Sequence, residues 1–394
     1  MAKVINNIPE HLLKQLPQLG YRPVKAEDQR VFDPYYDQMN GHWSSATCFL
    51  CLVAYEGIIT AFYKKAGEVL LCLEYDAIED ELVAIPFIGR YTRETVSHAF
   101  RILQSDMAAL GVPLVVMGIA PWMLPFYQES GVSWEITDSR DLQEYIYQRP
   151  DFLASMESSD SRYRYRYFIR RYAPETVTLT KEHWRECVDC MEEFWCPYTN
   201  CSSCHYGCPR GIVARVMREF EYMETDGLLV CVGGRPVGFC ITTYRNGLGV
   251  YQYKHADNHM KGINEYLLRE CFTRFPSGAE EINYTEDIGD EGLRAYKSEL
   301  APYTLLSRFT LSGIARDAPI TTKELCKNIV TRHGICDKMT EVTTIEGMKG
   351  LWRNESRQCF RYSMNIRDGF SLPAKPCPMG GEAFKKSVKS AARL

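Results

Sequence analysis

The sequence predicts an α+β fold with two mixed, mostly antiparallel sheets flanked by helices. Three observations lead to this prediction. Short segments with strand character, each bounded by turn residues, fall into two groups along the 394-residue chain. Each group is followed by helix, strand, helix and strand, so the same order occurs once in each half. A hydrophobic content of 45% and an aromatic content of 12% are enough to fill both cores.

The first half contains a group of expected strands and then one long helix. Turn residues separate strands that we expect at Cys48–Tyr55, Ile58–Tyr63, Glu68–Glu74 and Leu82–Ile85. Apolar residues at helical spacing predict a helix over Thr92–Leu110, which Gly111 ends. A buried strand (Pro113–Ile119) and a short helix (Pro121–Ser130) follow.

The second half repeats this order after two helices, at Lys181–Phe194 and Arg210–Glu224. Gly233-Gly234 and Asn246-Gly247 are strong hairpin signals. They separate strands at Gly227–Val232, Val237–Tyr244 and Leu248–Tyr253. The remaining elements are expected, in alternation of helix and strand, at Lys261–Phe275, Glu280–Tyr284, Glu291–Glu299 and Tyr303–Leu311.

The chain therefore divides into three expected parts. Residues 1–150 form a first domain, and residues 151–312 form a second domain that includes a cysteine-rich loop at 187–208. Residues 313–394 form an appended lobe with a helix at Thr321–His333 and a basic tail.

Composition excludes several classes of protein. A net charge of −4 argues against a surface that is basic throughout, although a local patch for nucleic acid is compatible with it. No apolar run approaches the roughly 20 residues of a membrane span, and the N-terminus lacks a signal-peptide core. We therefore expect a cytoplasmic protein, in which 16 cysteines are not disulfides. Cysteines that occur singly in apolar segments, such as Cys48 and Cys51, are expected to be small core residues.

The segment 281–304 concentrates charge at the end of a strand. Asn283, Glu286 and Asp287 follow one another at that end, and Arg294 and Lys297 lie at i and i+3 on the next helix. Such a group is one way to build a polar site. The alternative is an ordinary helix with acidic residues at its N-terminus and basic residues further along, as its dipole favours.

Four stretches resemble one family. They are 142–147 (LQEYIY), 162–172 (RYRYRYFIRRY), 254–263 (KHADNHMKGI) and 282–297 (INYTEDIGDEGLRAYK). Their residues and their order are similar to the C-terminal domain of phosphatidylglycerol lysyltransferases, the DUF2156 family, which is built from tandem units of the Gcn5-related N-acetyltransferase (GNAT) fold. The resemblance implies a tandem GNAT-like fold, acyltransferase activity and an aminoacyl-tRNA donor.

The resemblance also implies roles for individual residues. Catalysis would fall to the charged segment: Asn283, Glu286, Asp287, Arg294 and Lys297. Substrate would be bound by a strand-to-helix junction and a basic, aromatic helix: Lys254, Asp257, Lys261, Gly262, Arg166, Arg170 and Arg171. Glu286 or Asp287 would orient or deprotonate an acceptor amine or hydroxyl, and the cations would hold phosphate or developing negative charge.

Two other functions stay open. One is an N-acyltransferase that uses acyl-CoA, but the phosphate-binding loop of GNAT enzymes is reduced here to Gly262, with Asn264 in place of the second small residue. The other is a non-catalytic GNAT-like module that binds a ligand. Transfer itself requires no cofactor.

Six cysteines lie close together between residues 187 and 208. Four of them, Cys196, Cys201, Cys204 and Cys208, are candidate ligands for a structural zinc ion or an iron–sulfur cluster. A reduced loop without metal is the alternative. Cys187 and Cys190 lie on an expected helix at i and i+3 and are equally compatible with simple packing.

Overall fold

The computed structural model describes residues 8–39, 44–194, 209–276 and 278–314, together with two short strands further along the chain. By contacts the chain separates into two units, Met1–Gly313 and Ile314–Leu394. In the second unit the described residues are β16 (Phe360–Ser363) and β17 (Ser371–Ala374), which pair antiparallel. The helix expected at Thr321–His333 and the basic tail lie outside the described residues.

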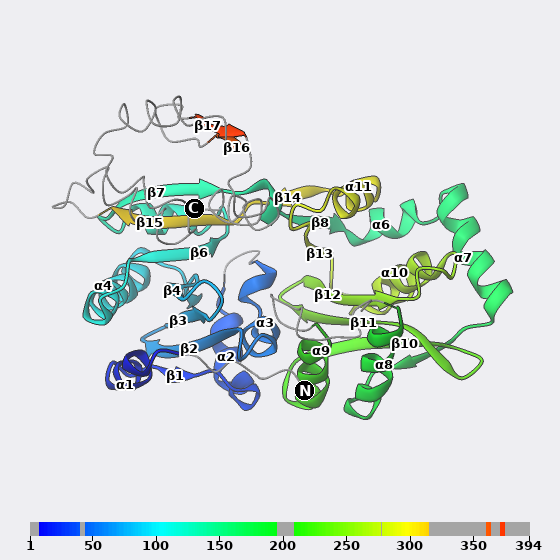
Figure 1. Ribbon diagram of the computed structural model, residues 1–394, viewed down its shortest axis with the longest axis horizontal. Helices are drawn as coiled ribbons and strands as arrows, with labels where there is room; N and C mark the ends of the chain where they lie inside the picture. The colour runs from blue at the N-terminus through cyan, green and yellow to red at the C-terminus, as the bar shows by residue number, and fades with distance from the viewer. Residues whose placement is uncertain are drawn as a thin grey trace. The chain divides into compact units, whose positions relative to one another are not determined.

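The first half of the larger unit is built on one mixed sheet, with strands in the order β1-β2-β3-β4-β6-β15-β7, and with β5 beside β3 (Figure 1). β4 and β6 pair in parallel, whereas β1–β2, β2–β3, β3–β4, β3–β5 and β6–β15 pair antiparallel. The strands are β1 (Arg22–Pro23), β2 (Ile59–Ala66), β3 (Val69–Asp76), β4 (Glu81–Ala84), β5 (Ile88–Gly89), β6 (Val115–Ile119), β7 (Ser133–Asp138) and β15 (Phe309–Ile314).

Five helices accompany this sheet, and the longest is α4 (Arg93–Leu110), which packs on β2 and β3. Thr92 caps its N-terminus by accepting a hydrogen bond from the Thr95 amide, and Gly111 ends it in the left-handed conformation, as expected. The others are α1 (Glu10–Gln18), α2 (Gln29–Tyr36), α3 (Phe49–Ala54) and α5 (Leu124–Gln128).

The second half is built on a second mixed sheet, in the order β14-β8-β13-β12-β11-β10-β9. In this sheet β12 and β13 pair in parallel, and the other neighbouring strands pair antiparallel. The strands are β8 (Glu144–Gln148), β9 (Glu175–Thr178), β10 (Thr225–Val232), β11 (Arg235–Arg245), β12 (Leu248–Ala256), β13 (Glu281–Glu286) and β14 (Thr304–Leu306). Both expected hairpins, β10–β11 and β11–β12, are present.

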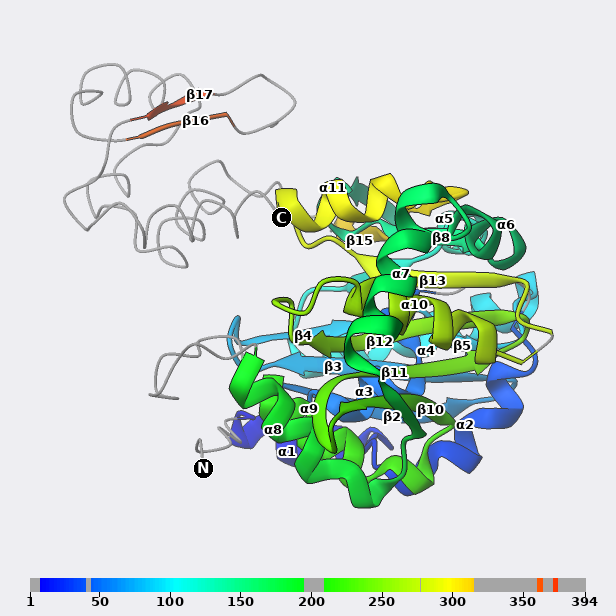
Figure 2. The same cartoon turned by 90° about the vertical axis from the view of Figure 1, so that its right-hand side faces the viewer.

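Helices cover the second sheet on two faces. A separate core lies beneath α6 (Arg149–Ser155), α7 (Ser159–Tyr172) and α10 (Ile263–Arg274), and Figure 2 shows α7 in front of α10. The other face, with α8 (Trp184–Phe194) and α9 (Pro209–Arg218), shares its core with the first half. This shared core explains why both sheets belong to one compact unit. The remaining helix is α11 (Glu291–Glu299).

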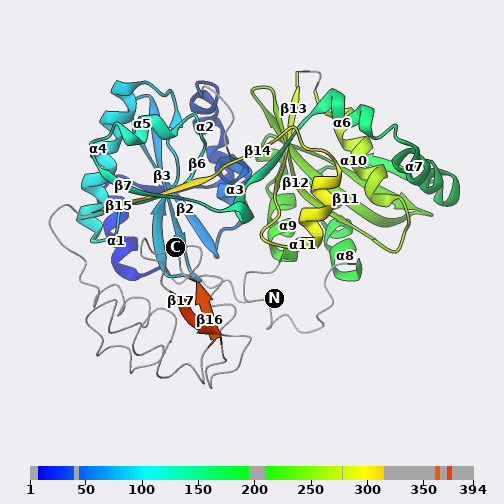
Figure 3. The same ribbon diagram turned by 90° about the horizontal axis from the view of Figure 1, so that it is seen from above.

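Each sheet contains a strand from the other half of the sequence (Figure 3). β8 precedes residue 150 but lies within the second sheet, between β14 and β13. β15 follows the second sheet in the sequence but lies within the first, beside β6. The chain therefore crosses between the halves twice, near residue 140 and again between β14 and β15.

Two expected strands are wrong. The segment Cys48–Tyr55 forms helix α3, because a short apolar run with five buried residues satisfies a buried helix as well as a strand. The segment Tyr303–Leu311 is not one strand but two, β14 and β15, which lie in different sheets. The helix expected at Arg210–Glu224 is shorter than predicted, since α9 ends at Arg218. The other expected elements in the described residues are confirmed within a few residues of their predicted ends.

Candidate functional site

The charged segment begins with a bulge at the end of β13. The register of β13 against β8 shifts between Asn283 and Glu286, and Thr285 has a φ of 55°. Lys297 of α11 fastens this bulge, since its Nζ donates to the carbonyl oxygens of Tyr284 (2.6 Å) and Glu286 (2.8 Å). A bulge turns the following side chain in a new direction. Lys297 is 2% exposed, and burial lowers its pKa to about 8.

Asp287 is a structural anchor rather than a free base. Its buried carboxylate accepts hydrogen bonds from Arg294 (2.8 and 3.0 Å), the Tyr145 hydroxyl (2.7 Å), Arg140 (3.0 Å) and the Gly289 amide (3.0 Å). Burial alone would raise its pKa, but these donors outweigh burial and hold the pKa of Asp287 below its usual range. Since every lone pair is engaged, Asp287 has no capacity left to take a proton from a substrate.

Arg294 is also committed within the protein. Besides Asp287, its guanidinium donates to Asp141 at 2.7 Å, and hydrogen bonds to these two carboxylates raise its pKa. The roles expected for Asp287, Arg294 and Lys297 as base and charge-neutralising cations stay predictions, and these contacts favour a structural role for all three. Their donors and acceptors are used to fix the strand end, the turn after it and helix α11.

Asn283 and Glu144 form a second buried group directly below Glu286. The Glu144 carboxylate is fully buried and accepts hydrogen bonds from Asn283 Nδ2 (2.6 Å), Ser44 Oγ (2.8 Å) and Ser45 Oγ (2.7 Å). Ser44 and Ser45 belong to the first half of the chain, so Glu144 joins the two halves. Asn283 thus orients a carboxylate and does not face solvent.

Among the residues expected to be catalytic, Glu286 is the one whose side chain stays available to contact a substrate. Its side chain is 24% exposed and forms an ion pair of 3.6 Å with Arg308 Nη1. The same Nη1 atom lies 3.5 Å from Glu144 Oε1. Arg308 lies on the chain between β14 and β15, where it crosses from one sheet to the other. Burial would lower the pKa of Arg308, but Glu144, Glu286 and other anionic neighbours raise it. Arg308 is therefore a cation.

A further carboxylate reaches this place from the first sheet. Glu74 on β3 is half-buried, and burial raises its pKa to about 7, an effect that Arg308 partly offsets. The Glu74 carboxylate therefore adds to the negative potential at Arg308, together with Glu144 and Glu286. Sequence reasoning missed Arg308, Glu74 and Glu144, because nothing in their local sequence indicates that the sheets meet here.

The neighbouring strand β12 contributes another bulge. Its register against β11 shifts so that Ile241 faces Tyr253 and Thr242 faces Tyr251, which leaves Gln252 as the extra residue. The amide of Gln252 contacts the sulfur atoms of Cys48 and Cys51, at 2.8 and 3.6 Å. Cys51 lies in α3 and Cys48 is the residue that precedes it, so β12 also meets the first half here.

The expected phosphate-binding end of α10 is closed by another helix. Gly262 precedes α10 with a φ of 92°, and a Cβ atom there would lie 2.2 Å from the carbonyl oxygen of Arg164 on α7. Asn264 fills the adjoining space, accepting from Lys254 Nζ (2.8 Å) and donating to Asn258 (3.1 Å). This glycine is required by helix packing, and the Ile263 amide at the start of α10 donates to the Met260 carbonyl oxygen at 3.2 Å.

Lys254 and Asp257 flank this junction in different ways. Burial lowers the pKa of Lys254 to about 8, and its Nζ lies 5.2 Å from the centre of the Tyr296 ring. Asp257 accepts a hydrogen bond from the His259 amide within its own turn, at 3.0 Å. Both residues are partly exposed, so they remain candidates for contact with a substrate.

The basic helix is confirmed as α7, and its arginines extend into solvent. Lys261 lies over the rings of Tyr163 (5.0 Å) and Tyr167 (5.5 Å), so the cation and the aromatic rings form one surface. Among the described residues, no acidic side chain forms an ion pair with Arg166, Arg170 or Arg171. By contrast, Arg164 is paired with Asp160 and Glu265.

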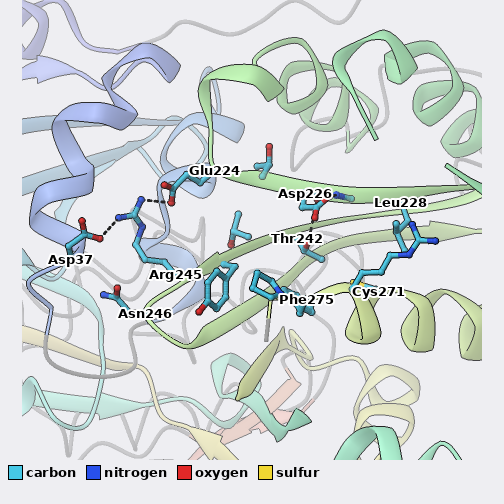
Figure 4. A pocket seen from close by; sticks show the side chains of 15 residues that line it. Asp37, Glu224, Asp226, Leu228, Thr242, Arg245, Asn246, Cys271 and Phe275 are labelled. Carbon is cyan, nitrogen blue, oxygen red and sulfur yellow. Dashed lines mark hydrogen bonds and ion pairs between the residues drawn. The ribbon is translucent and has the colours of Figure 1, made fainter. Parts of the chain in front are cut away.

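A pocket of about 410 Å³ lies at a different place, beside the β11–β12 hairpin and the end of α10 (Figure 4). Arg245 lies on its wall and is bound by Asp33, Asp37 and Glu224. Lys254 is separated from this hairpin by most of the length of β12, roughly 20 Å at the rise of a strand. We therefore place the candidate site at Glu286 and Arg308 and not in this pocket.

A protein-family model for the C-terminal part of phosphatidylglycerol lysyltransferase matches residues 46–312. The chain belongs to this family. The match includes most of both sheets together with Glu74, Glu144, Glu286 and Arg308. The expected tandem GNAT-like fold is confirmed, and so is the expectation that the protein is an acyltransferase.

Solved structures give the same fold. A conserved protein of unknown function from Bacteroides thetaiotaomicron superposes with a TM-score of 0.68 at 20% identity, over 75% of this chain and 99% of its own. The structure titled FemX gives 0.52 at 9% identity, over 74% and 96%. L-PGS from Bacillus licheniformis gives 0.45 at 14% identity, over 79% and 94%. No curated protein sequence matches the chain.

Two expectations concern metals and membranes. The candidate ligands Cys196, Cys201, Cys204 and Cys208 lie outside the described residues. Within the described parts of the chain, no group of three or more His, Cys, Asp or Glu side chains could hold a metal ion, and Cys187 and Cys190 pack in the core. No helix described by the structure is both long and apolar enough to cross a bilayer.

Proposed function

We propose that this member of the phosphatidylglycerol lysyltransferase C-terminal family transfers an aminoacyl group from an aminoacyl-tRNA to an amine or hydroxyl acceptor at Glu286. The observation that carries the proposal is the close approach of the Arg164 carbonyl to Gly262, because it leaves little room beside the N-terminus of α10, the helix end that holds acyl-CoA phosphates in GNAT enzymes. An acyl donor that does not depend on this cradle is therefore favoured, and transfer needs no bound cofactor.

The exposed surface of α7 supports a nucleic-acid donor. Arg166, Arg170 and Arg171 provide cations without acidic partners in the described residues, and Lys261 adds a further one against Tyr163 and Tyr167. Cations interleaved with exposed rings suit phosphates and unpaired bases. The alternative for this strip, a solvated helix face, does not explain why so many like charges are left unpaired on one short helix.

The proposed chemistry follows from the loosely held Glu286 carboxylate and the cationic Arg308 guanidinium. Glu286 is held by one long ion pair and can accept the proton of an acceptor amine or hydroxyl as it attacks the ester carbonyl carbon. Arg308 remains cationic and can stabilise the negative charge on the carbonyl oxygen. When the ester bond breaks, the terminal ribose oxygen leaves with the proton that Glu286 returns.

Binding assays with the full chain test the donor. We expect charged tRNA to bind with an affinity that falls steeply as salt is raised, and acetyl-CoA not to bind. Arg166→Ala should weaken tRNA binding and reduce its salt dependence, whereas Arg101→Ala, an exposed arginine on α4, should change neither. Binding of acetyl-CoA together with no binding of charged tRNA would overturn the proposal.

A transfer assay tests the site. With charged tRNA as donor and a small amine as acceptor, Glu286→Gln should reduce the rate by about 10²–10⁴-fold and leave donor binding unchanged. The control is Glu280→Gln, which removes an exposed carboxylate at the other end of β13. Equal rates for both variants would exclude Glu286 as the base.

A further inference from the structure

Cys48 and Cys51 are placed at the two positions of α3 where side chains converge. Cys48 is the N-cap, with extended backbone (φ −70°, ψ 147°), and Cys51 is the third residue of the helix. The N-cap and the third helical residue are the pair whose side chains meet in a capping box. The Cys51 amide donates to the Cys48 carbonyl at 3.0 Å, which keeps this first turn closed. The sequence Cys48-Phe49-Leu50-Cys51 thus forms a C-x2-C pair.

A single polar group holds both sulfur atoms. The amide of Gln252, the extra residue of the β12 bulge, donates to Cys48 Sγ at 2.8 Å and lies 3.6 Å from Cys51 Sγ. A bulge that directs an amide at two thiols is a built feature of the fold, because neither sulfur needs a partner if it only fills a core. Both cysteines lie in or against the core, as expected, but they form a pair rather than occurring singly.

The two cysteines of the pair differ from each other in access. Cys51 is partly exposed, whereas Cys48 is 2% exposed behind it. The contact with Cys48 and burial raise the pKa of the Cys51 thiol, and the nearby carboxylates of Glu286 and Glu74 act in the same direction. Both are free thiols in this structure. The pair is thus stable in its reduced form, and it lies next to the proposed transfer site.

We propose that Cys48 and Cys51 are a redox site that forms a reversible disulfide. With hydrogen peroxide as the oxidant, the Cys51 sulfur attacks one peroxide oxygen, the O–O bond breaks, and one water leaves. Cys48 then displaces the resulting hydroxyl as a second water, so two thiols and one peroxide give one disulfide and two waters. A dithiol reductant reverses the step by thiol–disulfide exchange.

Disulfide formation would also change the strand that faces the pair. A disulfide requires the two sulfur atoms to approach to about 2 Å, which removes the thiol proton that Gln252 accepts and turns both sulfurs toward each other. Gln252 then loses its donor at a bulge, next to Tyr253 and Lys254 on β12. The redox site itself does not depend on the proposed transfer activity.

Peptide mass spectrometry of the full chain tests the proposal. Trypsin should release residues 31–64 as one peptide, which contains Cys48 and Cys51 and no other cysteine. After treatment with hydrogen peroxide and alkylation, we expect this peptide to lose the mass of two hydrogen atoms and to resist alkylation. Dithiothreitol should restore two alkylation sites.

Two controls keep the result specific. Cys240 and Cys271 are also in contact but are fully buried, so they should stay reduced and become alkylated after unfolding. In Cys51→Ser the loss of two hydrogen atoms must disappear. The proposal is overturned if the wild-type peptide keeps two alkylatable thiols, or if it gains oxygen as a sulfinic or sulfonic acid without passing through the disulfide.

Discussion

Arg308 and Glu286 meet where the chain passes from one sheet to the other, with Arg308 Nη1 3.6 Å from Glu286 Oε2. The same nitrogen lies 3.5 Å from the buried carboxylate of Glu144. One guanidinium therefore connects a fully buried acid with a partly exposed one. Glu144 holds Arg308 in place, and Arg308 in turn limits where the Glu286 carboxylate can lie.

This relationship predicts that a lysine cannot replace Arg308. Lysine keeps the charge, but its shorter side chain will not place its nitrogen where Arg308 Nη1 lies 3.5 and 3.6 Å from the two carboxylates. We expect Arg308→Lys to lower the transfer rate by about 100-fold, the cost of misplacing a reacting group by about 1 Å. The assay is transfer under saturating donor. Arg93→Lys alters a bidentate surface pair with Glu129 and should have no effect. Equal rates in both variants would refute the positioning role.

Asp287→Asn should act on stability and not on the chemistry itself. The change leaves Arg294 and Arg140 facing a neutral group at a fully buried position, which we expect to cost roughly 3 kcal/mol in free energy of unfolding. Denaturant unfolding measures this loss. Asp141→Asn removes a half-exposed partner of the same arginine and should cost well under 1 kcal/mol. If Asp287→Asn abolished transfer at unchanged stability, a catalytic role for Asp287 would be restored.

Glu74 predicts a dependence of stability on pH. Its pKa in the folded chain is about 7, above its ordinary value of 4.5, so the folded state keeps a proton that the unfolded state has released between these values. The stabilising contribution is therefore complete below about pH 4.5 and is lost as pH rises through 7. Glu74→Gln cannot lose a proton, and we expect it to be more stable than wild type by about 1–2 kcal/mol at pH 8, after allowance for solvent screening.

The measurement is urea unfolding of both proteins at pH 5 and pH 8. The difference between variant and wild type should be larger at pH 8 than at pH 5. A difference that is the same at both values would show that Glu74 is ionised throughout this range in the folded chain.

Gly262→Ala tests whether α7 closes the N-terminus of α10. Two effects add at this position: a left-handed φ of 92° and a clash with the Arg164 carbonyl at 2.2 Å. Gly67→Ala is the matched control, because its φ is 65° and its Cβ would meet nothing within 4 Å. We expect the free energy of unfolding to fall by about 1 kcal/mol in the control and by at least twice as much in Gly262→Ala. Denaturant unfolding measures both losses. Equal losses would mean that α7 does not pack against Gly262.

Local sequence determined much of this protein. Turn residues and apolar spacing located the hairpins at Gly233-Gly234 and Asn246-Gly247, the ends of α4 at Thr92 and Gly111, and the bounds of α11. These features depend on contacts between residues near in sequence, which a pattern records directly. The motif that ends in Lys297 also indicated the family and the neighbourhood of the site.

Only the tertiary structure decided which of those residues can react. Asp287 and Glu286 are adjacent in sequence and chemically alike, yet a bulge buries one carboxylate among four donor groups and leaves the other partly exposed beside Arg308. Glu74, Glu144, Cys51 and Arg308 come from distant parts of the chain and meet because the two sheets exchange strands. Whether the hydrogen-bond donors and acceptors of a side chain are all used depends on such distant contacts, so no local sequence pattern could reveal it.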